Sequence, residues 1–467
     1  MRRVADRTPT TTLHAALRAE GLTGTKEGCA EGDCGACTVM VARPRGGRLD
    51  RRAVNACIMP LAMVHGAAVT TVEGLGGDHP VQREMVTRHA SQCGFCTPGF
   101  VMSLAARPVG APADRQALED RLAGNLCRCT GYGPIVEAGT AAAADADALA
   151  DEAADAALAA ELGAIGPLDM SVAGQRAIAP REEAGFAAAV AEHPDATIIS
   201  GATDVGLWIT KRLFMPETAI FAGEVDALRT IAVEGDRLVV GAAVTNQALA
   251  DAVAPHSAEL AELLRRFGGL QVRNAGTVGG NIANGSPIGD LPPALIAAGA
   301  TLTLGHADGA RSMALEAFFV DYGRQDRRPG EYVRHVSVPL AGLRALSCHK
   351  VSKRFDSDIT AVLGCFMVRV VDGRVAEARL AFGGMAGTPK RALAAEAALL
   401  EAPYTEAAVS EAARALEDDF SPLTDLRASA AYRLAVARNL LRRDFIERTQ
   451  PGVATRLAGA AGAEVAA

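Results

Sequence analysis

The pattern of hydrophobic and polar positions changes along the chain, and its first part predicts one helix among short strands. Residues 12–20 carry apolar side chains at helical spacing, with threonines before them and Gly21 behind. The β-branched run 38–42 predicts a strand that Pro44 and Gly46 end. Four stretches of helical length then lie between glycines and prolines, which indicates a small helical bundle: 82–89, 99–106, 115–123 and 132–144.

The rest of the chain mixes strand and helix patterns. Residues 141–162 are almost wholly Ala, Asp, Glu and Leu, and so few large apolar groups favour a surface connector between domains. Beyond residue 168 the pattern predicts strands at 196–200 and 237–241 and helices at 246–252 and 256–267. After about residue 346 it predicts a further unit with strands 359–371 and 375–383 and helices 390–399 and 405–447.

These patterns suggest the domain limits. A chain of 467 residues is long enough for about three domains, each with its own core. We expect a strand-rich domain at 1–73, a helical domain at 74–144, a linker at 145–167, a larger α/β domain at 168–345 and a C-terminal domain at 346–450.

Composition narrows the setting in which the protein works. The net charge of −7 argues against nucleic acid as the main partner. No apolar run approaches the roughly 18–20 residues of a membrane span. Met1-Arg2-Arg3 is followed by Val4-Ala5-Asp6-Arg7, where a signal peptide would have its apolar core. We therefore expect the protein in the cytoplasm, with reduced thiols and with neither nucleic acid nor membrane as a partner.

Eight of the ten cysteines fall in the first 129 residues, in two groups of four. The first cysteine group (Cys29, Cys34, Cys37 and Cys57) begins as C-x4-C-x2-C, and the second (Cys93, Cys96, Cys127 and Cys129) joins C-x2-C to C-x-C. C-x4-C-x2-C followed by a distant cysteine is the spacing of plant-type [2Fe–2S] ferredoxins. Four thiolates hold one cluster, so the sequence predicts two clusters and the passage of single electrons.

Other interpretations of the cysteines are weaker. Zinc also takes four cysteines, but its ligands usually pair as C-x2–4-C, and C-x-C at Cys127 and Cys129 fits that habit poorly. A disulfide framework needs an oxidising compartment. A zinc-stabilised binding module without electron transfer stays open as the alternative of a different class. Cys348 and Cys365 lie in distant apolar stretches and are expected to be ordinary buried thiols.

Two glycine-rich turns follow strands in the predicted α/β domain, at 200–204 and 277–281. Backbone N–H groups of such turns form concave nests that bind anions such as pyrophosphate, and Thr203, Thr277 and Asn281 add side-chain donors. No G-x-G-x-x-G opens a helix after a strand here, which disfavours a Rossmann site. Because clusters pass single electrons and nicotinamide takes a hydride, the chemistry favours a flavin between them.

Several strings of the chain resemble the molybdenum hydroxylase family, and within it the small, iron–sulfur and FAD-containing subunit of the bacterial xanthine dehydrogenases. The resemblance extends over nearly the whole length. The strings that carry it are Gly28–Met40, Gln92–Gly99, Gly124–Tyr132, Gly279–Ile282, Ser286–Asp290 and Phe382–Ala386.

The resemblance implies a multidomain α+β fold with a β-grasp [2Fe–2S] ferredoxin domain and a four-helix [2Fe–2S] domain. An FAD-binding domain of the vanillyl-alcohol-oxidase (PCMH) type with a C-terminal α/β cap would follow. The turn at 198–205 would bind the pyrophosphate and ribityl chain of FAD, and 277–281 would be a second phosphate turn. The implied FAD contacts are Ile198, Ile199, Ser200, Gly201, Ala202, Thr203, Asp204, Val205, Phe267, Thr277, Val278, Gly279, Gly280, Asn281, Asp290, Val333 and Lys350.

By the same resemblance, electrons would leave molybdenum on a partner subunit, cross the cluster of the second cysteine group and then that of the first, and reach FAD and NAD+. The reaction would be the oxidation of hypoxanthine and xanthine to urate. A larger partner subunit would bring molybdopterin and the substrate pocket, because this chain is too short to carry that domain, and relatives form dimers of heterodimers. No residue here would be catalytic in the hydroxylation, and Gln92 would hydrogen-bond the partner's pterin. An aldehyde or N-heterocycle oxidoreductase with the same cofactor domains is the alternative.

The chain departs from the family pattern at two places. Family members begin with an extra strand and turn before the stretch that matches Arg2-Arg3-Val4, so we expect a truncated or misassigned start. Gly323 stands where an arginine is usual, in a loop near the flavin. That loop influences nicotinamide access, and the choice between NAD and oxygen as acceptor stays open.

Overall fold

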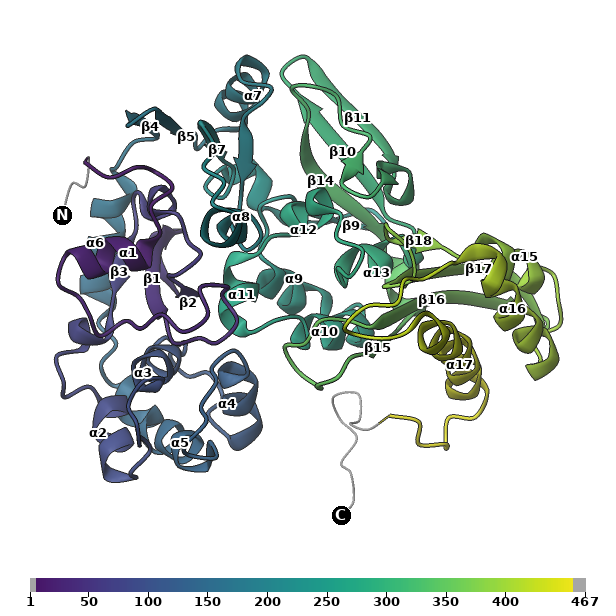
Figure 1. The fold of residues 1–467 in the computed structure, drawn as a ribbon, viewed down its shortest axis with the longest axis horizontal. Coiled ribbons are helices and arrows are strands. Elements are labelled where there is room, and N and C mark those ends of the chain that lie inside the picture. Colours follow the sequence, from purple (N-terminus) through teal and green to yellow (C-terminus); the bar gives the residue numbers. More distant parts are fainter. Residues whose placement is uncertain (1–5, 457–467) are drawn as a thin grey trace. The chain divides into compact units, whose positions relative to one another are not determined.

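The structure is a computed structural model that describes residues 6–456, arranged in two compact units (Figure 1). The first unit extends to Val225 and also contains Gly268–Gly276, and the second consists of Asp226–Phe267 and the chain from Thr277 on. The predicted α/β domain 168–345 is therefore divided between the two units. The expectation about the start of the chain concerns residues outside the described range.

A three-stranded antiparallel sheet begins the first unit, with the order β2-β1-β3. The predicted helix before it is present and starts where the Thr12 hydroxyl accepts a hydrogen bond from the Ala15 amide. The strand predicted at 38–42 extends three residues further, through Pro44 to Arg45, and the turn falls on Gly46–Gly47. The elements are α1 (Leu13–Ala19), β1 (Thr38–Arg45), β2 (Arg48–Asn55) and β3 (Ala68–Thr70).

The predicted bundle of four helices follows. Phe100, Leu118 and Ile135 are almost wholly buried at its centre, which is the pattern expected when each short helix turns one apolar stripe inward. The helices are α2 (Pro80–Thr87), α3 (Thr97–Ala105), α4 (Arg115–Leu122) and α5 (Gly133–Asp147).

The alanine-rich stretch predicted as a surface connector contains a helix, α6 (Glu152–Gly163). Asp151 caps its first turn, and Ala159 and Leu162 are buried where the helix packs on β1 and β2. Arg51 on β2 also pairs with Asp155 on the helix. Small alanines let the helix lie close to the sheet, so a sequence poor in large apolar groups still forms part of the packing.

The rest of the first unit is a four-stranded sheet of order β4-β5-β7-β6, in which β5, β7 and β6 are parallel. The segment Gly268–Gly276 adds a short helix to this unit. The elements are β4 (Leu168–Val172), β5 (Gln175–Ala179), α7 (Glu183–Glu192), β6 (Thr197–Ile199), α8 (Val205–Arg212), β7 (Thr218–Phe221) and α11 (Leu270–Ala275).

The second unit begins with a five-stranded antiparallel sheet of order β11-β10-β14-β9-β8. Helices α9 (Asn246–Val253), α10 (Ala258–Arg265), α12 (Val278–Asn284) and α13 (Leu291–Ala297) share its core. A small hairpin, β12 (Phe319–Asp321) and β13 (Arg324–Gln325), turns at Gly323 with φ +67°, a conformation that favours glycine. The sheet strands are β8 (Ile231–Glu234), β9 (Arg237–Gly241), β10 (Thr301–His306), β11 (Gly309–Ala314) and β14 (Tyr332–Pro339).

The second unit ends in a four-stranded antiparallel sheet, β15-β16-β17-β18, which packs against helices (Figure 1). The single helix predicted at 405–447 is wrong: the chain forms two helices, because Pro422 interrupts the pattern and Ser429 caps a new start. The elements are α14 (Leu340–Ala345), β15 (Leu346–Val351), β16 (Val362–Val371), β17 (Arg374–Gly383), β18 (Lys390–Arg391), α15 (Leu393–Leu399), α16 (Glu406–Asp419) and α17 (Ala430–Thr449).

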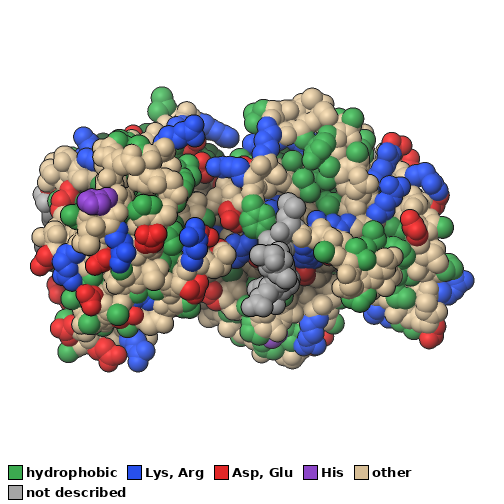
Figure 2. All heavy atoms as spheres, turned by 90° about the horizontal axis from the view of Figure 1, so that it is seen from below, with side chains coloured by type: hydrophobic (Ala, Val, Ile, Leu, Met, Phe, Trp, Pro, Cys, Tyr) green, Lys and Arg blue, Asp and Glu red, His purple; other side chains and the backbone are tan. Residues whose placement is uncertain are grey.

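The surface carries charges of both signs. Figure 2 shows Lys and Arg side chains interspersed with Asp and Glu over the face that it presents. Among the described residues, no helix combines the length and the apolar character needed to cross a bilayer.

Three aromatic rings anchor the C-terminal core, and the first prediction concerns them. Phe382 lies between Phe366 and Phe420, with ring centroids 5.3 Å apart in both pairs. We expect Phe382→Ala to lower the free energy of unfolding by about 3–5 kcal/mol, since it opens a cavity among buried rings. Denaturant titration of the purified chain measures this change. Leu426→Ala, at a side chain 81% exposed, is the control and should change little; equal losses in the two variants would contradict this account of the core.

Candidate cofactor sites

The first cysteine group gathers at one end of the β1–β2 hairpin. Cys37 precedes β1 and Cys57 follows β2, and Thr38 pairs with Asn55 in the antiparallel register. Because strand partners lie opposite one another, these two cysteines come to the same end of the sheet, where both are buried. The loop before β1 brings Cys29 and Cys34 to them, and the Glu31 and Cys34 amides donate to the Cys29 sulfur at 3.3 and 3.4 Å.

Contacts among the thiols connect all four sulfurs of this group. Hydrogen bonds from Cys34 and Cys57 lower the pKa of Cys29, and the same contacts raise the pKa of Cys34 and Cys57. A hydrogen bond with Cys57 also lowers the pKa of Cys37. Four cysteines that shift one another's pKa in this way, with backbone amides directed at the Cys29 sulfur, form a donor set that fits a [2Fe–2S] cluster.

The second cysteine group lies between helices of the bundle. Cys96 is the N-cap of α3, and Cys127 and Cys129 lie in the loop between α4 and α5. Burial and a hydrogen bond with Cys127 raise the pKa of Cys96 to about 12. Burial opposes ionisation of Cys127, but the Thr130 hydroxyl, 3.2 Å from its sulfur, and backbone amides lower its pKa.

Cys93 and Cys129 are exposed, so this second group reaches the surface of the first unit. In residues 6–456, no group of three or more His, Cys, Asp or Glu side chains is arranged to hold a metal ion directly. Cys96 and Cys127 nevertheless interact with each other, and the charge of Cys93 also contributes to the raised pKa of Cys96. This donor set also fits a cluster held by cysteine sulfur alone.

The two groups touch each other through the backbone. The Leu126 amide, directly before Cys127, donates to the Cys34 carbonyl at 3.0 Å. A Cβ atom added to Gly35 would lie 2.3 Å from the Gly124 carbonyl oxygen, and one added to Gly99 would lie 2.2 Å from the Gly35 carbonyl oxygen. The glycines of the cysteine strings thus permit loop-to-loop packing that no other residue would allow.

The first predicted FAD turn also belongs to the first unit. Ile198 and Ile199 end β6, Ser200 to Asp204 form the loop, and Val205 begins α8. Ala202 adopts φ +58°, and a Cβ on Gly201 would lie 2.1 Å from the Ala275 carbonyl oxygen. The buried Ser200 hydroxyl has no hydrogen-bond partner in the protein. A tight turn with an unsatisfied hydroxyl, at the carboxyl end of a parallel strand, fits a phosphate-bearing ligand.

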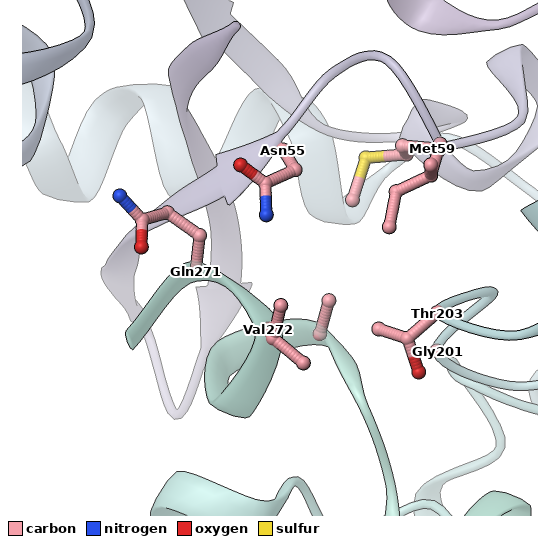
Figure 3. A pocket seen from close by; sticks show the side chains of 8 residues that line it. Asn55, Met59, Gly201, Thr203, Gln271 and Val272 are labelled. Carbon is pink, nitrogen blue, oxygen red and sulfur yellow. The ribbon is translucent and has the colours of Figure 1, made fainter. Parts of the chain in front are cut away.

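Helix α8, which follows this turn, contacts the first cysteine loop. Lys211 donates to the Cys29 carbonyl at 2.7 Å, and Thr210 donates to the Ala30 carbonyl at 2.9 Å. A cavity of about 10 Å³ lies nearby, lined by Asn55, Ile58, Met59, Gly201, Thr203, Gln271, Val272 and Ala275 (Figure 3). The figure shows the loop after β6, helix α11 and the end of β2 around it. The predicted FAD turn and the first cysteine group are therefore neighbours.

The second predicted FAD turn lies in the second unit. Thr277 caps α12 by accepting from the Gly280 amide at 3.2 Å, and Val278 begins that helix. Gly279 approaches the end of β9, where an added Cβ would lie 2.5 Å from the Ala242 Cβ. The Asn281 side-chain oxygen is buried without a partner, as expected of a residue that awaits a ligand.

Two further predicted contacts of the second unit, Lys350 and Asp290, pair with each other. Lys350 on β15 is 2% exposed and pairs with the buried Asp290 at 2.6 Å, so it is not a solvated surface residue. Its ammonium also donates to the Arg266 carbonyl at 3.4 Å, next to Phe267. Thr360 donates to the other Asp290 oxygen. Val333 lies on β14 and packs partly buried against the sheet core.

Sequence reasoning missed a buried polar cluster beside the cysteines. The amide of Gln271 on α11 contacts Thr38, Ser103 and Asn125 in the first unit. Asn125 stands inside a cysteine string and Thr38 follows Cys37, so their places offered a signal. Nothing local marks Gln271, which is far from both groups in sequence. Cys348 and Cys365 pair across β15 and β16, with Cys365 buried and Cys348 half-buried.

Comparisons with known protein families match four stretches of the chain. Family profiles match residues 2–62 (2Fe-2S iron-sulfur cluster binding domain), 71–140 ([2Fe-2S] binding domain), 173–341 (FAD binding domain in molybdopterin dehydrogenase) and 347–448 (CO dehydrogenase flavoprotein C-terminal domain).

Proteins similar to the chain over most of its length include xanthine dehydrogenases. The chain is 32% identical over 480 residues to xanthine dehydrogenase of Emericella nidulans, covering 88% of the chain and 35% of that protein. It is 31% identical to xanthine dehydrogenase/oxidase of Gallus gallus, covering 89% of the chain and 37% of that protein. The chain thus spans about a third of the length of these relatives.

Solved structures resemble the flavoprotein part. Quinoline 2-oxidoreductase from Pseudomonas putida 86 matches 58% of the chain and 94% of the solved chain, with TM-score 0.53 and 25% identity. Carbon monoxide dehydrogenase from Hydrogenophaga pseudoflava matches 57% and 94%, with TM-score 0.54 and 29% identity. Together with the two cysteine groups, these matches define an iron–sulfur flavoprotein. The chain belongs to the molybdenum hydroxylase family, of which it carries two [2Fe–2S] domains and the FAD-binding domain.

The assignment of the cysteines predicts distinct losses. We expect Cys37→Ser to remove the cluster of the first group and Cys93→Ser that of the second, each lowering bound iron by about half, because each cluster needs its four ligands. Iron analysis and low-temperature electron paramagnetic resonance (EPR) of the reduced protein measure this. Cys348→Ser is the control and should keep all iron. Zinc in place of iron, or one variant that removes both signals, would contradict the assignment.

The buried ion pair of the second unit predicts a stability effect. Lys350→Met should lower the free energy of unfolding by about 3–5 kcal/mol, because it leaves the Asp290 carboxylate buried without its cation. The double variant Lys350→Met/Asp290→Asn should recover much of the loss. Denaturant titrations of the two variants and the unchanged chain compare these values; a harmless single variant would show that Asp290 has another cation.

Proposed function

We propose that this chain is the iron–sulfur and FAD subunit of a xanthine dehydrogenase. Electrons from a molybdenum site on a partner subunit would pass to the second cysteine group, then to the first, then to FAD and NAD+, while hypoxanthine and xanthine are oxidised to urate. Its residues bind and orient the carriers and take no part in the hydroxylation itself. The curated relatives, which bear the name xanthine dehydrogenase, support the substrate class.

One observation carries this proposal: the loop of the first cysteine group hydrogen-bonds in two directions. The Cys34 carbonyl accepts from Leu126 beside the second group, and the Cys29 carbonyl accepts from Lys211 on the helix that follows the predicted FAD turn. The order second group, first group, FAD turn is thus already present within the first unit. Such an order suits a protein that passes single electrons in sequence to a flavin.

The surface around the second group supports a partner at the other end of this order. Cys93 and Cys129 are exposed, and so are the apolar side chains of Phe95 (48%), Leu126 (41%) and Tyr132 (39%). Exposed apolar side chains beside a functional group are typical of a protein interface. We infer that the molybdopterin-binding subunit docks here, with the exposed Gln92 directed to its pterin.

The FAD contacts follow from the predicted residues and their surroundings. We propose that Ile198, Ile199, Ser200, Gly201, Ala202, Thr203, Asp204 and Val205 hold the pyrophosphate and ribityl chain, and that Phe267, Thr277, Val278, Gly279, Gly280, Asn281, Asp290, Val333 and Lys350 complete the site. The unsatisfied Ser200 hydroxyl and Asn281 side-chain oxygen are the observations that favour it. When bound, a flavin converts single electrons into a hydride for nicotinamide.

An aldehyde or N-heterocycle oxidoreductase is the second candidate, favoured by the structural similarity to quinoline 2-oxidoreductase. The residues that would distinguish the substrates lie on the partner. We also keep the cytoplasm as the expected location and a dimer of heterodimers as the expected assembly.

Co-purification with the partner subunit tests the proposal. We expect visible absorption from iron–sulfur and flavin, and NADH formation that depends on xanthine and is lost in Cys93→Ser, because electrons enter through the second group. Turnover of an aldehyde or a quinoline without xanthine turnover would favour the second candidate. A colourless protein that contains zinc would overturn both.

A further inference from the structure

Gln271 lies at the centre of a buried polar cluster in the first unit. Gln271 is 1% exposed, and its amide Nε2 lies within hydrogen-bond distance of three oxygens: Thr38 Oγ1 at 3.2 Å, Ser103 Oγ at 3.0 Å and Asn125 Oδ1 at 2.8 Å. The two N–H groups of the amide are shared among these oxygens. All three partners are as deeply buried as Gln271 itself. We call these four residues the Gln271 node.

Each partner of Gln271 is attached to a cysteine segment. Thr38 directly follows Cys37, Asn125 stands two residues before Cys127, and Ser103 lies on α3, the helix that Cys96 caps. The node therefore joins segments of both cysteine groups through one side chain. That side chain comes from α11, which lies outside both predicted iron–sulfur domains.

The node also holds the carbonyl of Gly35, which lies between Cys34 and Cys37. Thr38 Oγ1 donates to this carbonyl at 2.6 Å, and Asn125 Nδ2 donates to it at 3.1 Å. Ser103 in turn donates to Asn125 Oδ1 at 2.7 Å. The first cysteine loop is thus hydrogen-bonded to the second through atoms that Gln271 orients.

Close backbone packing fixes α11 against the second cysteine segment. A Cβ atom on Gly269 would lie 2.5 Å from Gly124 Cα, and one on Gly124 would lie 2.3 Å from Gln271 Oε1. Both glycines are therefore required for this approach. Gln271 Oε1 itself is buried without a partner, so the node carries a polar group whose burial is unfavourable. Apolar side chains in place of these four residues would avoid that cost. The polar node is therefore better explained by the fixed arrangement of the cysteine loops that its hydrogen bonds provide.

We propose that Gln271 is a positioning residue for electron transfer between the two clusters. It holds the loop of Cys34 and Cys37 against the loop of Cys127 and Cys129, and so sets the separation of the carriers. With both clusters bound, the transfer of one electron from the second group to the first would oxidise one ferrous iron and reduce one ferric iron, and the node would transfer no proton. This inference rests on the proposed function.

The position of α11 in the chain extends the role of the node. The segment Gly268–Gly276 is preceded by Phe267 and followed by Thr277, both predicted FAD contacts of the second unit. The residue that orders the cluster loops is therefore joined by a few peptide bonds to the proposed flavin contacts. No other residue of the node has this connection.

The test is Gln271→Met in the cofactor-loaded protein, which keeps the side-chain volume and removes the hydrogen bonding of the amide to the three oxygens. We expect iron content to stay unchanged. The magnetic interaction between the two reduced clusters, seen by low-temperature EPR, should weaken, and electron exchange between them should slow several-fold. Ser103→Ala, which removes one of the three contacts, should shift both readouts in the same direction by less.

Two further measurements keep the outcome decisive. Val190→Ala, at a buried site on α7, is the matched control and should lower stability without changing the EPR interaction. In Gln271→Met the hydrogen of the Leu126 amide should exchange with solvent faster, with or without iron. The reason is that the Cys34 carbonyl, which accepts its hydrogen bond, is no longer held in position.

An unchanged spin interaction and electron exchange in Gln271→Met would overturn the proposal. If that variant loses its iron, an unchanged interaction in Ser103→Ala would overturn it equally. Failure of the proposed function would look different from failure of this inference. An unaltered chain that binds no iron would refute the two clusters. Solvent exchange of the Leu126 amide would still show whether the node holds the two cysteine loops together.

Discussion

The four sulfurs of a cysteine group must lie close together if they are to share one cluster, and this requirement shapes the first unit of the protein. Thiols in such proximity perturb one another strongly, as the opposite pKa directions of Cys29 and Cys34 show. The surrounding backbone therefore has to hold them in place. It does so with an antiparallel hairpin whose two strands end beside Cys37 and Cys57, and with amides directed at the Cys29 sulfur.

The two cysteine groups are neighbours because their loops pack closely against each other. Gly35, Gly99 and Gly124 allow the cysteine loops to pack backbone against backbone, and the Cys34 carbonyl accepts the amide next to Cys127. On its other side, the first loop accepts hydrogen bonds from α8, directly after the predicted FAD turn. The loop of the first cysteine group therefore contacts both the second cysteine group and the helix that follows the predicted FAD turn.

Much of this could be predicted from local sequence. The four short helices, the β1 strand and the two cysteine groups follow from periodicity and spacing, because each depends on residues close together in the chain. Local patterns failed where packing decided. The alanine-rich stretch forms α6 against the first sheet, and the long C-terminal helix pattern breaks at Pro422 into two helices. The pairing of Lys350 with Asp290 was also beyond local sequence, because the two residues lie far apart in the chain.

By itself, the sequence determined which residues are candidates to hold iron and where the chain turns tightly, since both follow from the type of side chain and its spacing. Only the tertiary structure decided that Gln271 reaches Thr38, Ser103 and Asn125, that Gly269 meets Gly124, and that Lys211 reaches the Cys29 carbonyl. These contacts join segments separated by more than a hundred residues. They arise because buried polar groups must find partners wherever the fold brings them, and no local pattern of residues specifies that choice.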